Sequence, residues 1–208
     1  MFDGPEESVT QLVELLQSSR PRDRWKAADK LGRRGRGSDE VVAALLLCAQ
    51  DEDDDVRCSA ARALGHAGTD RCAPELVRLL GDDDGGVRWG AAEGLGNLGA
   101  SASCGLVQLR EALDDIEEDV RGASAQTLGK LVRLVAVPAN DLVAPLIRSL
   151  SDRAWSVRRS AVEALGRCGA AASSGSSEIQ QLAESDPHPR VRQAAEVSLR
   201  LILGPAQA

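Results

Sequence analysis

The chain has 208 residues, of which 43% are hydrophobic, 27% charged and 2% aromatic, a composition that excludes extensive disorder. With so few aromatic residues, a core of Ala, Leu and Val in close-packed helices is favoured over a sheet. The formal net charge of −7 argues against general nucleic-acid binding, because a basic surface supplies most of that affinity.

The chain's start and its cysteines predict a cytoplasmic protein. The opening MFDGPEESVTQLVELL lacks the basic-then-apolar order of a signal peptide. The longest apolar run, Val41–Ala49, is too short to cross a bilayer, so we expect no membrane insertion. The five cysteines form no C-x-x-C pair, and neither His66 nor His188 shows ligand spacing. We therefore expect free thiols, no metal site and no cofactor.

Six segments of the chain align without gaps. They are DRWKAADKLG from Asp23, VRCSAARALG from Val56, VRWGAAEGLG from Val87, VRGASAQTLG from Val120, VRRSAVEALG from Val157 and VRQAAEVSLR from Val191. Their starts are 33, 31, 33, 37 and 34 residues apart. A period this regular is typical of a stacked array of repeats.

Each segment has the apolar pattern of a helix. Its first, fifth and ninth positions form one stripe, since residues four apart share a helix face. The ninth position is Leu in all six segments. The fifth is small in all six, so that a neighbouring helix can approach closely: Ala27, Ala60, Ala91, Ser124, Ala161 and Ala195.

Polar and glycine residues predict where these helices begin and end. The residue five positions before each segment is a candidate N-cap: Ser18, Asp51, Asp82, Asp115, Asp152 and Asp186. The glycine at the tenth position is the expected stop, often followed by a second one: Gly32, Gly65, Gly96, Gly129 and Gly166, then Gly35, Gly68, Gly99 and Gly169. The fourth helix is expected to run on through Gly129 into KLVRLVAV.

Shorter apolar stretches lie between the segments and predict a second, shorter helix in each unit. They are Val9–Leu16, Val41–Ala49, Leu76–Leu80, Leu106–Leu113, Leu142–Leu150 and Ile179–Leu182. We expect a flexible connection at residues 170–177, AAASSGSS. The predicted organisation is one domain over residues 1–208, with repeats near 6–35, 38–68, 70–99, 103–135, 140–169 and 176–203.

The consensus D-x-x-x-x-V-R-x-x-A-A-x-x-L-G-x-x-G resembles the short HEAT-like repeat, which is also found in the phycobilisome lyase group. The resemblance implies an all-α, right-handed α-solenoid of about six helix-turn-helix repeats. It places the first helix of each pair on the convex side and the second along the concave side. The first repeat departs from the pattern with Asp23 in place of Val, and the last with Arg200 in place of Gly. Such departures suit end units that meet water.

The second position of every segment is Arg. We interpret these arginines as a structural ladder, in which each planar guanidinium bridges a carboxylate or loop carbonyl of a neighbouring repeat. The ladder comprises Arg24, Arg57, Arg88, Arg121, Arg158 and Arg192, with Asp51, Asp82, Asp115, Asp152 and Asp186.

The positions that vary between repeats are the candidates for partner binding. Helix geometry predicts that the third, fourth, seventh and eleventh positions are exposed. The partner-binding candidates are Trp25, Lys26, Arg33, Arg62, His66, Trp89, Glu93, Asn97, Lys130, Arg159, Glu163 and Arg167. These four columns hold six basic and three acidic residues, which suits an acidic partner; ordinary mixed surface charge is the alternative.

The tryptophans and the last repeat leave further alternatives open. Trp25 and Trp89 either contact a partner or cover the core, whereas Trp155 is expected to pack between repeats. The apolar side chains Val197 and Leu201, with Ile202 and Leu203, are expected to form a terminal patch or simply to fray. We expect a monomer or a weak dimer.

One motif suggests a nucleotide enzyme but does not fit its context. Gly94, Gly96 and Gly99 have the G-x-G-x-x-G spacing, yet they fall at a helix end, where the dipole disfavours phosphate. Gly94 has no glycine counterpart in the other repeats. We therefore predict no catalytic residues and a non-enzymatic scaffold that binds a protein or peptide on its concave face. The alternative is a bilin lyase-type or chaperone-like subunit that acts with a partner chain.

Overall fold

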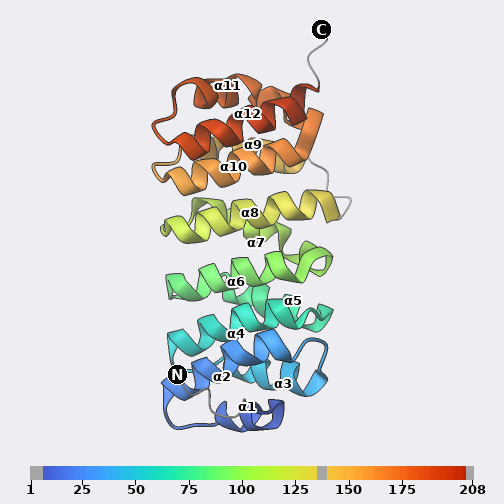
Figure 1. Ribbon diagram of the computed structural model, residues 1–208, viewed down its shortest axis with the longest axis vertical. Helices are drawn as coiled ribbons and strands as arrows, with labels where there is room; N and C mark the ends of the chain where they lie inside the picture. The colour runs from blue at the N-terminus through green and yellow to red at the C-terminus, as the bar shows by residue number, and fades with distance from the viewer. Residues whose placement is uncertain (1–6, 135–139, 205–208) are drawn as a thin grey trace, which may run out of the picture. The chain divides into compact units, whose positions relative to one another are not determined.

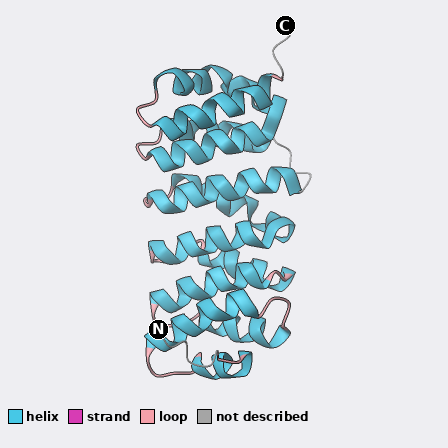
Figure 2. Ribbon diagram, in the orientation of Figure 1, coloured by secondary structure: helices cyan, strands magenta, loops and turns pink. Residues whose placement is uncertain are grey.

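The computed structural model describes residues 7–134 and 140–204, and all regular structure within them is helical (Figure 2). This part of the chain offers no helix with both the length and the apolar character needed to cross a bilayer. The helices form two compact units, Met1–Cys104 and Gly105–Ala208. The prediction of one domain over the whole chain stays a prediction.

The first unit consists of three helix pairs (Figure 1). The longer helices are α2 (Pro21–Arg34), α4 (Asp54–Ala67) and α6 (Gly85–Leu98), and α4 packs between the other two. Their shorter partners are α1 (Val9–Leu15), α3 (Asp39–Cys48) and α5 (Ala73–Leu79). The 3-10 turn η1 (Asp70–Cys72) precedes α5, and the turn η2 (Gly99–Gly105) follows α6.

The second unit repeats this arrangement. Its longer helices are α8 (Glu118–Leu134), α10 (Trp155–Cys168) and α12 (Pro189–Leu203), with α10 packed against both others. Its shorter helices are α7 (Leu106–Glu111), α9 (Asn140–Arg148) and α11 (Ser176–Ser185). The 3-10 turns are η3 (Ala112–Asp114), η4 (Ser149–Ser151) and η5 (Gly169–Gly175).

The predicted apolar stripe forms the core of both units. The small residues of the fifth column are all at most 1% exposed, and the ninth-column leucines are fully buried from Leu31 to Leu165. Leu199 in the last repeat is half-buried. Close packing of one helix on the next therefore rests on Ala and Leu, as the composition predicted.

The predicted N-caps were wrong by two residues. The helices α4, α6, α10 and α12 are capped at Asp53, Asp84, Ala154 and His188. The residue two positions earlier accepts a hydrogen bond from the backbone N–H of the cap, as Asp51 Oδ1 does from Asp53 at 3.0 Å. The same holds for Ser18, Asp82, Asp115, Asp152 and Asp186. These side chains shape the turn before the helix.

The predicted helix ends were also too early. All five tenth-position glycines lie inside helices, which continue to the second glycine or beyond. Gly68 then ends α4 in the left-handed conformation, with φ of 73°. Gly65 instead permits a close helix crossing, because a Cβ there would lie 2.4 Å from the Gly94 Cα. Gly94 is thus a packing residue, although the repeat pattern showed no reason for it.

The length of the fourth long helix and the connection at residues 170–177 were also predicted from the sequence. Helix α8 is longer than its counterparts, with 17 residues against 14 in α10, which confirms the extension past Gly129. Residues 135–137 of that extension lie outside the described residues. The predicted flexible connection at 170–177 was wrong, because η5 and the start of α11 occupy it and bury Ala172 and Gly175.

Candidate functional site

The second-position arginines reach from one repeat to the loop of the next. Arg24, Arg57, Arg121 and Arg158 each donate through Nε and Nη2 to both oxygens of an aspartate, respectively Asp51, Asp82, Asp152 and Asp186, at 2.6–3.0 Å. Fork-to-fork pairing of this kind adds geometric specificity to charge attraction.

The remaining nitrogen of each guanidinium binds the backbone of its own repeat. In Arg121, Nη1 donates to the carbonyl oxygens of Asp115 and Ile116 at 2.8 and 3.0 Å. Arg88 and Arg192 make the same kind of contact, to residues 82–83 and 186–187. One arginine therefore ties together two successive loops, with the side chains of Arg121 and Asp152 only 9% and 12% exposed.

These contacts lower the pKa of the paired aspartates. Burial alone would raise the pKa of Asp152, but the hydrogen bonds from Arg121 and from the Ala154 N–H outweigh it. The pKa values of Asp51, Asp82 and Asp186 are lowered against burial in the same way. The ionised carboxylate is thus the form that the folded chain favours.

Acidification is expected to destabilise the protein through these carboxylates. Their folded pKa lies below the value of about 3.9 for an unfolded Asp, so their contribution is intact above about pH 5. It is lost as the pH falls through 4 toward the folded pKa. Urea unfolding followed by circular dichroism at a series of pH values measures the loss. The Asp152→Asn variant should lose less stability on acidification than wild type, and equal losses would contradict the assignment.

In the first unit, the predicted partner-binding side chains largely pair with one another. Arg62 donates to Glu93 at 2.8 Å and lies 5.3 Å from the Trp89 ring centroid. Lys26 lies 5.8 Å from the ring of the half-buried Trp25. Arg33 forms an ion pair with Asp29. His66 and Asn97 are exposed.

The variable columns are less open than predicted. Most of the third and seventh positions are half-buried, and Gly90 in the fourth column is fully packed. A Cβ at Gly90 would lie 3.0 Å from the Cys58 carbonyl oxygen, because the neighbouring helix passes close by. Trp155 stacks on His188 of the next repeat, with ring centroids 3.9 Å apart, which confirms its expected packing role.

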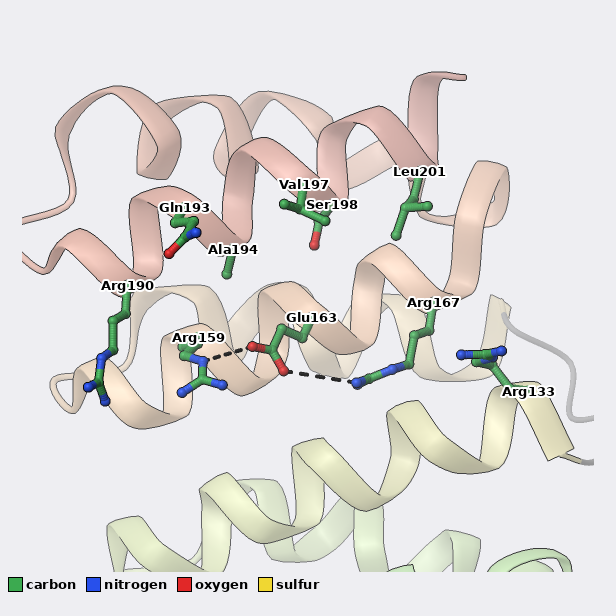
Figure 3. A pocket seen from close by; sticks show the side chains of 10 residues that line it. All are labelled: Arg133, Arg159, Glu163, Arg167, Arg190, Gln193, Ala194, Val197, Ser198 and Leu201. Atoms are coloured by element: carbon green, nitrogen blue, oxygen red, sulfur yellow. Dashed lines mark hydrogen bonds and ion pairs between the residues drawn. The ribbon is translucent and has the colours of Figure 1, made fainter. Parts of the chain in front are cut away.

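A groove of about 530 Å³ runs between α10 and α12 in the second unit (Figure 3). One side carries Arg159, Glu163 and Arg167 of α10, all three predicted as partner-binding residues. The α12 side carries the apolar residues Ala194, Val197 and Leu201 beside Arg190, Gln193 and Ser198. Val197 and Leu201 are 51% and 58% exposed and lie one helical turn apart, so together they present an apolar surface to the groove.

The groove has a surplus of positive charge. Four arginines line it against the single carboxylate of Glu163: Arg133, Arg159, Arg167 and Arg190. Glu163 accepts from Arg159 at 2.7 Å and pairs with Arg167 at 4.0 Å. Arg133 has no hydrogen bond or ion pair to any residue within 7–134 and 140–204, and Arg190 lies 5.7 Å from the Trp155 ring centroid. The ends of the groove therefore offer cations with few partners.

Sequence reasoning missed parts of this groove. Arg133 lies three residues past the eleventh position of its repeat and Arg190 one residue before the first, so both fall outside the aligned columns. Extending the columns by one helical turn each way would have found them. The predicted terminal patch was partly wrong: Ile202 is 4% exposed and faces the core, whereas Val197 and Leu201 line the groove.

Several cysteine thiols, a half-buried lysine and a cluster of aspartates lie outside the groove. Burial raises the pKa of Cys58 to about 11, and those of Cys48 and Cys168 likewise, so these thiols are poor nucleophiles. Lys130 is half-buried and makes contacts of its own. Asp53, Asp54 and Asp55 lie together at the start of α4, where Asp53 caps the helix.

Helix pairs joined by a repeated arginine–aspartate contact define a repeat protein of the α-solenoid class. The family follows from the sequence. A family model for HEAT repeats matches residues 42–129 and 106–200, and the chain belongs to the HEAT-repeat family. No curated protein sequence matches the chain.

Solved structures with the same fold include natural and engineered proteins. An engineered protein is 21% identical, with a TM-score of 0.74 over 95% of this chain and 97% of that one. A designed armadillo repeat protein in complex with the peptide (KR)4 is 19% identical, with a TM-score of 0.67 over 94% and 100%. The complex of CpcE and CpcF of phycocyanin lyase from Nostoc sp. PCC7120 is 21% identical, with a TM-score of 0.51 over 96% of this chain and 97% of that one. At these identities the likeness shows the fold alone.

Proposed function

We propose that the chain is a non-enzymatic scaffold that binds a protein or peptide on the exposed side of its longer helices. The observation that carries the proposal is the groove between α10 and α12, where arginines at both ends flank the exposed side chains of Val197 and Leu201. The apolar side chains offer contact area, and the arginines, a residue type enriched at interfaces, offer directional hydrogen bonds to a partner.

The charge of the groove suggests what kind of partner it accepts. A designed armadillo repeat protein of the same fold is solved with the basic peptide (KR)4. Four arginines against one glutamate would repel such a peptide here and would attract an acidic one. The five free cysteines support a reducing compartment, and we propose a cytoplasmic location.

Affinity capture from the source organism tests the proposal. A variant with Arg133→Glu and Arg190→Glu reverses the charge at both ends of the groove. The matched control carries Arg110→Glu and Arg153→Glu, two exposed arginines outside the groove with the same change in net charge. We expect at least one protein captured by wild type and control to be lost from the groove variant. Identical sets of proteins from all three would overturn the proposal.

A lyase-type subunit acting with a partner chain is the second candidate. It is supported by the likeness to the CpcE–CpcF structure and by arginines that could bind the propionates of a bilin. Adding phycocyanobilin separates the candidates. A peptide scaffold leaves the bilin absorbance unchanged, whereas a shift that the groove variant abolishes would favour the lyase-type function.

A further inference from the structure

We infer that the α10–α12 groove binds an extended peptide with the pattern acidic-x-apolar-x-acidic, an inference that rests on the proposed function and names the partner. Two properties of the groove carry this inference, namely the spacing of its arginines and the position of Glu163 (Figure 3).

The spacing of the arginines determines the spacing of the ligand's carboxylates. Arg159 and Arg167 are eight residues apart on α10, which is roughly 12 Å along the helix axis. Arg190 lies toward the Arg159 end and Arg133 toward the Arg167 end (Figure 3). An extended chain covers about 13 Å in four residues, close to the separation of the two arginines, and residues i and i+4 point the same way. Two carboxylates four residues apart would therefore reach both arginine pairs.

The middle of the groove selects against a third carboxylate. Glu163 lies between Arg159 and Arg167 and interacts with both. Its charge would repel an acidic side chain at i+2, and such repulsion is a common source of specificity. Across the groove, the half-exposed Val197 offers an apolar contact at the same level (Figure 3). An apolar side chain at i+2 therefore fits best.

An extended segment suits this pattern, because residues i, i+2 and i+4 of an extended chain all point to one side. In a helix, residues i and i+2 do not share a face, so the central apolar side chain and both carboxylates could not all face the groove.

Fluorescence anisotropy with labelled peptides tests the inference on the full chain. The probe GESLSEG has the proposed pattern, GEESLSG has the same composition in a different order, and GESESEG adds a central acid. We expect wild type to bind GESLSEG about tenfold more tightly than either control peptide. Tighter binding of GESESEG would mean that the groove senses net charge alone and would overturn the inference.

Variants show whether binding occurs in the groove. Arg133→Ala and Arg190→Ala should each weaken GESLSEG binding about tenfold, while Arg110→Ala on α7 should leave it unchanged. Glu163→Gln should improve binding of GESESEG, because it removes the repelling charge. Equal effects of all arginine variants, or no gain from Glu163→Gln, would overturn the inference. If the groove captures a partner in the affinity experiment but binds no peptide, the inference fails and the proposed function stands.

Discussion

Replacing Arg121 with alanine is expected to lower the free energy of unfolding by about 3 kcal/mol, the low end for breaking a buried ion pair. Arg121 joins Asp152 through two hydrogen bonds at 2.6 and 2.9 Å and also binds two loop carbonyls. Its removal leaves Asp152 charged in a largely buried position. For a chain of this size, the melting temperature should fall by roughly 6–12 °C.

Arg192→Ala is the matched control within the same ladder. Arg192 keeps the contacts to the carbonyls of Asp186 and Pro187, and no aspartate fork is seen for it within the described residues. Its loss should cost about 1 kcal/mol. Equal destabilisation by the two variants would mean that the fork contributes little. GESLSEG binding should be unchanged in Arg121→Ala, because the ladder lies outside the groove.

Replacing Gly65 with alanine is expected to cost about 2 kcal/mol, even though alanine favours the helix by about 1 kcal/mol. The added Cβ would lie 2.4 Å from both the Cα and the carbonyl oxygen of Gly94. Because these are backbone atoms, only a shift of α4 away from α6 can relieve the overlap. Urea unfolding measures the cost.

Gly122→Ala in α8 is expected to have the opposite effect on the free energy of unfolding. A Cβ at Gly122 would meet only Val157 Cγ2, at an ordinary 3.9 Å. The substitution should therefore stabilise the chain by about 0.5–1 kcal/mol through helix propensity. Stabilisation at both positions would contradict the assignment of Gly65 to a helix crossing.

The repeat pattern predicted the fold well because the same few positions recur six times. The Val, Ala and Leu positions of the stripe are equivalent in every repeat, so the six segments together identify the buried positions better than one segment could. The helix ends were predicted less well. Asp51 and Asp53 are both good caps by residue type, and only the reach of Arg24 to Asp51 distinguishes them.

The candidate site was predicted only in part, because it depends on how helices pair. Arg159, Glu163 and Arg167 were found since they occupy repeat columns. Arg133 lies near the end of α8 and Arg190 near the start of α12, and no pattern within one repeat indicates that they line the same groove. The self-pairing of Arg62 with Glu93 likewise joins two repeats, so the charge available to a partner could not be read from column totals.

The pairing of each arginine with the aspartate of the next loop determines how repeats can be gained or lost. Asp51 and Asp82 stand at equivalent points, each followed two residues later by the cap of its helix. Recombination that removed residues 52–82 would join Asp51 to Asp83 and Asp84 and would leave Arg24 facing the same kind of loop. Gly32, which now packs on Ala63, would meet the still smaller Gly94. Whole repeats can thus be lost or duplicated without a new kind of contact, which lets evolution lengthen the array while keeping the groove.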